Sequence, residues 1–216
     1  MLVIFPLQKC HAVSSLSQTC LLTATNLSNV NTQLSRAVLR GGIGFCLVSL
    51  VVFATVAFGE RWMYMRLGEL GAYIAWTLAF ILLGGAVLGT IVGDSRWRLP
   101  KFYLLWGLAF FAYAAGWVCA YFMLRGALGE WVGSLVGSLL MTVVFALGFS
   151  APRLIPKLFG LLFIANSAGY FLGSTVNDQL GGRPGMLLWG LIYGLFLGSG
   201  IGALLSKLKN ASPNVL

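Results

Sequence analysis

The sequence contains few charged residues, and acidic residues are especially scarce. Charged residues make up 9% of the 216 positions, with five Asp or Glu and a single His. Enzymes need carboxylates, imidazoles or activated nucleophiles within hydrogen-bonding reach of one another. The single His is His11, and the five acids are dispersed along the chain at Glu60, Glu69, Asp94, Glu130 and Asp178. The composition therefore predicts a protein that is not an enzyme.

Cysteine is also sparse, and its spacing matches no metal site. Cys10, Cys20, Cys46 and Cys119 form no CxxC pair, whereas zinc ligands usually come in such close pairs. A bound pigment or haem would need a ligand such as His within the apolar part of the chain, where none occurs. We expect no metal, no disulfide and no cofactor.

Long apolar runs dominate the rest of the chain, which is 59% hydrophobic. A membrane-spanning helix needs about 20 consecutive apolar residues, because in lipid every backbone polar group must be paired within the protein. Six runs approach this length, and the charged residue within them is Lys157, at an edge. The runs cover residues 41–59, 70–93, 102–124, 131–149, 157–177 and 185–206. We predict an all-α integral membrane protein with six transmembrane helices.

The basic residues that produce the net charge of +9 flank the apolar runs singly or in small groups. They do not cover one face, as nucleic-acid binding would require. Lys and Arg are retained on the cytoplasmic side of membranes. With the N-terminus inside, the inner segments hold Lys9, Arg36, Arg40, Arg96, Arg98, Lys101, Arg153, Lys157, Lys207 and Lys209, and the outer connections hold Arg61, Arg66, Arg125 and Arg183. We predict a lipid bilayer and not nucleic acid as the surroundings, with both termini on the cytoplasmic side.

Residues 1–40 form a polar, Ser- and Thr-rich segment that differs from the six-helix domain over 41–206 and from the short basic tail over 207–216. A Ser-rich segment without acids is typical of an organellar transit peptide, and its apolar start resembles a secretory signal. A disordered tail explains the same composition, and we favour it. The membrane is then the plasma or inner membrane, and an organellar one if the segment is a transit peptide.

Glycines recur at every fourth position within the apolar runs. This spacing places them on one helix face, where they allow two helices to approach closely. They are Gly85, Gly89 and Gly93, then Gly169 and Gly173, then Gly190, Gly194, Gly198 and Gly202. Such glycine-zipper faces predict tight packing within the chain, with a homo-oligomer or another membrane protein as the alternative partner.

Two short segments occur twice in the same order. LGTIVGD at 88–94 resembles LGSTVND at 172–178, and LLWGL at 104–108 recurs at 187–191. A duplication would relate residues 41–125 to residues 131–206. Three helices in each unit would give the units opposite orientations in the membrane, which is a design of secondary transporters. Chance matches between Leu- and Gly-rich runs are the alternative.

The segments GTIVGDSRWRLPK, at 89–101, and NDQLGGRPGMLLWG, at 177–190, combine Gly, an acid and bases. In this they resemble the loop between the second and third helices of the major facilitator superfamily. The resemblance implies transport and a charged latch between neighbouring helices, formed by Asp94, Arg96, Arg98, Asp178 and Arg183. Alternatively, these acids are solvated helix-end and turn residues.

One polar stripe lies within an apolar run. Asn166, Tyr170 and Asn177 share a helix face, with Ser174 beside them. The stripe is a candidate solute path, and interhelical hydrogen bonding is the alternative. Together these features favour a small transporter or channel for facilitated passage of a polar solute. The alternative is a non-catalytic membrane subunit of a larger complex.

Overall fold

The structure, a computed structural model, describes residues 10–92 and 98–211, and their side chains over 31–92 and 99–211. The helices are α1 (Cys10–Val92), α2 (Arg98–Leu124), α3 (Gly126–Gly148), the short 3₁₀ helix η1 (Pro152–Leu154), α4 (Ile155–Leu180) and α5 (Gly182–Ala211). The predicted all-helical fold is therefore confirmed. Five of these helices are long and apolar enough to cross a membrane.

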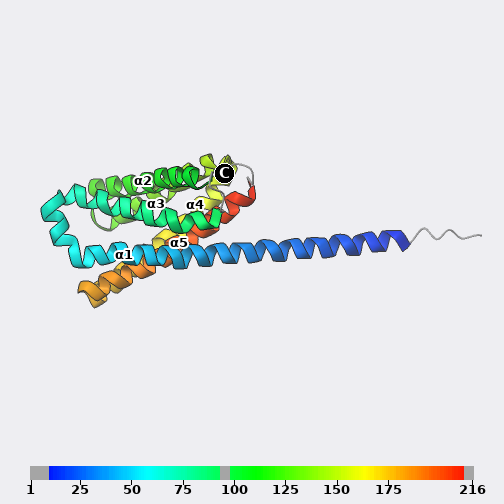
Figure 1. Ribbon diagram of the computed structural model, residues 1–216, viewed down its shortest axis with the longest axis horizontal. Coiled ribbons are helices and arrows are strands. Elements are labelled where there is room, and N and C mark those ends of the chain that lie inside the picture. The colour runs from blue at the N-terminus through cyan, green and yellow to red at the C-terminus, as the bar shows by residue number, and fades with distance from the viewer. Residues whose placement is uncertain (1–9, 93–97, 212–216) are drawn as a thin grey trace, which may run out of the picture.

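The helix α1 contains both of the first two predicted spans. Its backbone is interrupted at Gly68, where φ is 71° and ψ is 174°. An L side chain rarely adopts a positive φ, so glycine is required for this break. In the cyan part of α1 the chain turns back, and the second arm runs along the bundle (Figure 1). Where the sequence predicts two separate spans over 41–59 and 70–93, the structure has one interrupted helix.

The helix α1 also takes in the predicted tail. The sequence favours disorder over residues 1–40, whereas the chain is helical from Cys10 onward. Between Cys10 and Arg40 there is no Pro and no Gly, so the local sequence contains no strong helix breaker. The blue part of α1 extends far beyond the other helices (Figure 1). Residues 1–9 of the predicted N-terminal tail and the second half of the predicted C-terminal tail, 212–216, lie outside the described residues.

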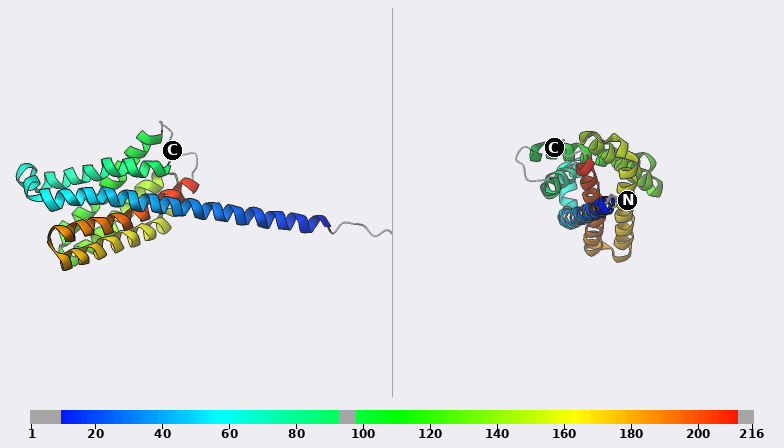
Figure 2. Two further views of the ribbon diagram at one scale, coloured as in Figure 1. Left: turned by 60° about the horizontal axis from the view of Figure 1, so that its bottom comes forward. Right: turned by 90° about the vertical axis from the view of Figure 1, so that its right-hand side faces the viewer.

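The remaining helix boundaries follow the prolines and glycines. Pro152 is the first residue of η1 and Pro156 is the second residue of α4, at positions where the missing N–H has no intrahelical partner anyway. The α4/α5 connection turns at Gly181, whose φ is 66°. These breaks keep the connections short, so consecutive helices lie antiparallel in a bundle (Figure 2). The Gly68 turn and the α2/α3 and α4/α5 connections share one end, which we call the Gly68 end (Figure 1).

Large apolar side chains cover the outside of the bundle. Leu70, Leu104 and Ile164 are 73%, 67% and 68% exposed. A water-soluble monomer rarely exposes apolar surface on this scale. The outer surface is therefore suited to lipid, in agreement with the apolar helices beneath it.

The interior is most densely packed in the half away from the Gly68 end. Trp106 of α2 is fully buried there, and its ring centroid lies 5.8 Å from that of Phe45 and 6.3 Å from that of Phe145. Its indole Nε1 donates a hydrogen bond to the Ile81 carbonyl oxygen at 2.9 Å. This core joins the two arms of α1 to α2 and α3.

The glycines of α5 face α1. A Cβ added at Gly198 would strike the Gly41 carbonyl oxygen, and one added at Gly194 would lie 2.5 Å from Ser49 Cβ. The two backbones therefore approach closely over this stretch, where the nearest side-chain atoms are the Cβ atoms of Phe45 and Ser49. At Gly190 the same face meets the Phe53 ring, 2.6 Å from an added Cβ.

The other predicted packing glycines also lie against neighbouring helices. An added Cβ would meet the Tyr103 ring at Gly85 and Leu99 at Gly89. On α4, a Cβ added at Gly169 would lie 2.9 Å from Phe196 Cβ, and one added at Gly173 would meet the Trp189 ring. A Cβ at Gly202 of α5 would meet the Ala37 backbone of α1, and the predicted Gly93 lies outside the described residues.

We expect Gly198→Ala to destabilise the protein and Gly160→Ala to leave it unchanged or slightly more stable. The first adds a Cβ where the Gly41 backbone leaves no room, which costs about 1–3 kcal/mol. The second adds a Cβ with no atom within 4 Å, and helix propensity then favours Ala by up to about 1 kcal/mol. Far-UV circular dichroism during thermal or detergent-induced unfolding measures both. Equal shifts in the two variants would contradict the close contact between α1 and α5.

Candidate functional site

A cavity of about 380 Å³ lies between the helices in the half nearer the Gly68 end. Its lining is mostly aromatic and comes from α1, α2, α4 and α5. The lining residues are Val52, Phe53, Val56, Glu60, Tyr64, Tyr73, Trp76, Thr77, Phe80, Phe110, Tyr113, Ala114, Trp117, Val118, Tyr121, Tyr170, Met186, Trp189 and Tyr193. Glu60 is exposed, so the cavity reaches the surface beside it. The volume lies within the usual range for small-molecule pockets.

The wall formed by α2 depends on small residues of α3. Three aromatic residues of α2 follow one another at every fourth position, and each lies over a glycine of α3. The pairs are Tyr113 with Gly137, Trp117 with Gly133, and Tyr121 with Gly129. The glycines bring α3 against the α2 backbone, and the rings of α2 are left to line the cavity.

Ring contacts continue around the cavity from helix to helix. Trp117 of α2 lies 5.6 Å from Tyr170 of α4, measured between ring centroids. Tyr170 lies 5.4 Å from Trp189 of α5, and Trp189 lies 5.6 Å from Phe53 of α1. These distances are typical of favourable aromatic pairs. Side chains from four helices therefore support one another as a continuous wall.

The two arms of α1 complete the wall near the Gly68 turn. The Trp76 ring centroid lies 5.9 Å from that of Tyr64 and 5.7 Å from that of Tyr73, and both pairs are edge to face. Burial, together with nearby Tyr73 and Glu60, raises the pKa of the Tyr64 hydroxyl. Tyr64 therefore remains a neutral hydrogen-bonding group next to the carboxylate of Glu60.

The deep end of the cavity is closed by a buried hydrogen-bond network. The Tyr113 hydroxyl donates to Asn166 Oδ1 at 2.8 Å, and it lies 2.8 Å from the Tyr193 hydroxyl. Because Tyr113 has a single proton to donate, Tyr193 is the donor in the second bond. Asn166 Nδ2 donates to Ser134 Oγ at 2.8 Å, and Ser134 Oγ lies 2.7 Å from Ser167 Oγ. The network joins α2, α3, α4 and α5.

The predicted polar stripe of α4 is divided between the cavity and other contacts. Tyr170 lines the cavity, and Asn166 lies fully buried in the network beneath it. Ser174 is half-buried and does not belong to the lining. Asn177 packs against α5, because a Cβ at Gly185 would lie 2.9 Å from Asn177 Oδ1. The structure thus brings together the first two residues of the stripe.

The predicted latch residues are only partly described. Asp94 and Arg96 lie outside the described residues, as does the side chain of Arg98 at the start of α2. Asp178 and Arg183 are exposed at the α4/α5 connection. The guanidinium carbon of Arg183 lies 4.8 Å from the centroid of the Phe58 ring, which is a cation–π contact between α5 and α1.

The aromatic wall was not predicted from the sequence, although part of its signal was present. Tyr113, Trp117 and Tyr121 have the spacing of one helix face, as do Trp189 and Tyr193. Membrane helices are rich in aromatic residues at many positions, so this spacing by itself does not separate a cavity wall from lipid-facing residues. The two tryptophans of the repeated LLWGL segment illustrate this. Trp106 Nε1 is bonded in the core, while Trp189 Nε1 is buried without a hydrogen-bond partner among the described residues.

Among residues 31–92 and 99–211, whose side chains the structure describes, no group of three or more His, Cys, Asp or Glu side chains is arranged to hold a metal ion. A scan against protein-family models and searches of curated proteins and of solved structures find no match to this chain. The site is therefore interpreted from its own geometry.

We expect Tyr113→Phe to destabilise the protein more than Tyr103→Phe. The first change removes two buried hydrogen bonds and leaves Asn166 Oδ1 and the Tyr193 hydroxyl unpaired, at a cost of about 1–2 kcal/mol. The second removes an exposed bond of 3.3 Å to the Leu82 carbonyl oxygen, which contributes about 0.5 kcal/mol or less. Unfolding midpoints in detergent give the difference. Equal losses would show that the network does not stabilise the bundle.

Proposed function

We propose that this chain crosses a membrane six times and provides a route for a small solute through its aromatic cavity. Six crossings require that the two arms of α1 span the membrane separately. Two facts support this: the break at Gly68 and the return of the second arm along the bundle (Figure 1). The side facing the cytoplasm is the one that holds Arg36 and Lys207, because basic residues predominate there.

Cysteine accessibility tests the six crossings. In a variant without the four native cysteines, we expect Met65→Cys and Gln179→Cys to react with a membrane-impermeant maleimide added to intact cells. We expect Gln33→Cys and Asn210→Cys to react only after permeabilisation, because six crossings place residues 33 and 210 inside. All four positions are exposed. If Gln33→Cys reacts from the outside while Asn210→Cys is protected, α1 crosses once and the proposal of six crossings is wrong.

The observation that carries the proposed route is the cavity with its closed deep end. The cavity reaches the surface near Glu60 and ends at Tyr113 and Tyr193, whose hydroxyls belong to the buried network. A solute could enter from the Gly68 end and would meet the network near the middle of the bundle. The wall is mainly aromatic and apolar, so the solute that fits has apolar surface rather than being uniformly polar.

Passage would require the network to open. The bonds of Tyr113 to Asn166 and Tyr193 join α2 to α4 and α5. The helix α2 belongs to the first half of the predicted inverted repeat, and α4 and α5 belong to the second. Rocking of one half against the other would separate these bonds and expose the cavity to the opposite side, and it would also shift α5 along α1 and α3 along α2, where the helices are in close contact. Each bond contributes only about 0.6–1.7 kcal/mol in a membrane protein, so the hydrogen bonds themselves are a small part of the cost of opening.

The alternative function, a non-catalytic membrane subunit, would need a glycine face that is free to dock a partner. On α5 that face is covered by α1. The described residues therefore favour a solute route. Absence of flux would instead support the function as a membrane subunit.

Flux into liposomes containing the purified protein tests the route. The panel includes neutral polyols, amino acids, organic anions and organic cations. We expect Val118→Trp to lower the flux of the transported solute about tenfold or more, because Val118 lines the cavity and the larger ring would fill it. Cys119→Trp is the matched control, since the neighbouring Cys119 is exposed. Absence of flux across the panel, or equal flux in both variants, would exclude passage through this cavity.

A further inference from the structure

The faces and edges of the cavity rings determine which charge the cavity favours. Aromatic faces carry negative partial charge, so a cation placed over Trp or Tyr rings is attracted, and more strongly where water is excluded. Three tryptophans line the cavity, namely Trp76, Trp117 and Trp189. A cluster of this kind is the usual recognition site for quaternary ammonium groups.

Carboxylates gather beside the same cavity. Glu60 lies next to Tyr64, Glu69 lies near Tyr73, and Glu130 of α3 lies close to Tyr170. The three tyrosines belong to the cavity lining. The whole chain has five acidic residues and a net charge of +9, so this placement of three acids around one cavity is not explained by composition.

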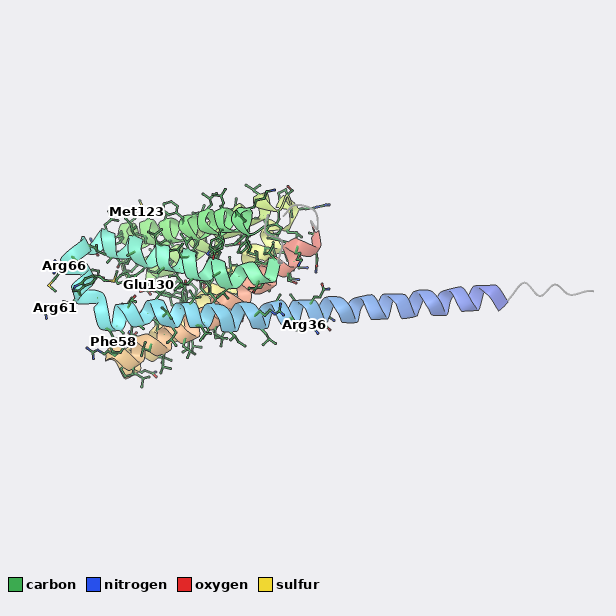
Figure 3. All side chains as sticks on the ribbon, in the orientation of Figure 1. Arg36, Phe58, Arg61, Arg66, Met123 and Glu130 are labelled. Atoms are coloured by element: carbon green, nitrogen blue, oxygen red, sulfur yellow. The ribbon has the colours of Figure 1, made fainter. Side chains whose placement is uncertain are left out.

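The arginines of the Gly68 end lie outside the cavity lining. Arg61 and Arg66 lie at that end together with Glu130, away from Arg36 (Figure 3). Of the described residues that line the cavity, Glu60 is the one with a formal charge, and none is an arginine. Arg183, from the same end, is placed over Phe58 instead. Glu60 and the neighbouring Arg61 line the same surface hollow beside the entrance, so the outer surface carries both signs of charge, while the charged group of the cavity lining is Glu60.

We propose that the cavity binds a monovalent organic cation with an apolar substituent, such as an aryl or alkyl quaternary ammonium ion, with Glu60 at the entrance and the tryptophan faces around the cationic head. This inference rests on the proposed function and names its substrate class. A hydrated metal ion fits less well, because Glu60 supplies the carboxylate of the described lining and the other side-chain oxygens are neutral Tyr and Thr hydroxyls, whereas Ca²⁺ and Mg²⁺ sites use carboxylate and carbonyl oxygens. An anion would face the ring faces and Glu60, both of which repel it.

Binding by the intact protein in lipid nanodiscs tests the proposal separately from flux. The probe is benzyltrimethylammonium, and its neutral isostere 2,2-dimethyl-1-phenylpropane has the same shape without the charge. Titration calorimetry and quenching of tryptophan fluorescence measure binding, with empty nanodiscs subtracted. We expect the cation to bind at least about tenfold more tightly than the isostere, since even one desolvated cation–π contact supplies that factor.

Two matched pairs of variants locate the site. We expect Glu60→Gln to weaken cation binding about tenfold, whereas Asp178→Asn, at an exposed acid outside the cavity lining, changes it less than twofold. Trp76→Leu should weaken binding, whereas Trp62→Leu should not, because Trp62 is 59% exposed and lies outside the lining. Unchanged unfolding midpoints establish that the variants are folded.

The proposal is overturned if the cation and the isostere bind equally, if neither binds, or if Glu60→Gln and Asp178→Asn have the same effect. Flux of neutral solutes that Val118→Trp abolishes would then leave the proposed route intact without cation selectivity. Selective cation binding without flux would instead support the site and reject transport.

Discussion

The backbone contact between α1 and α5 is the constraint on which the rest of the bundle depends. Gly41 and Gly198 leave no room for a side chain between the two helices, so the first and last helices of the bundle lie as close as their backbones permit. Further along the same faces, Gly190 meets Phe53, whose ring lies 5.6 Å from that of Trp189. The packing of these helices thereby positions part of the cavity wall, and the glycine spacing serves the site as well as the fold.

The division between small and large residues continues through the bundle. Glycines of α3 lie against the aromatic face of α2, and Gly173 of α4 lies against Trp189 of α5. One half of the interior is filled by rings such as Trp106 and Phe45, while the other half keeps a cavity of about 380 Å³. Between them lies a polar layer in which Asn166 is paired on both sides, because an unpaired amide in apolar surroundings would be costly.

Several features were predictable from residue type and spacing. The predicted spans 102–124 and 157–177 fall within α2 and α4, because an apolar run without charges has the length and the internal hydrogen bonding of a helix. The polar stripe led to Asn166 and Tyr170, since spacing of four defines a helix face. The continuation of α1 through residues 10–40 was not predicted. Polar composition indicates solvation, and helix formation there depends on the absence of Pro and Gly rather than on an apolar face.

The sequence by itself determined the apolar helices α2 to α5, the faces on which the glycines lie and the exclusion of charge from the interiors of the apolar runs, because these depend only on residue type and local spacing. Only the tertiary structure decided that Glu60, Trp76, Trp117, Tyr170 and Trp189 surround one cavity. These residues come from four helices separated by up to more than a hundred positions. Their proximity follows from how closely each pair of helices can approach, and that distance is set by both partners of a contact and not by either segment alone.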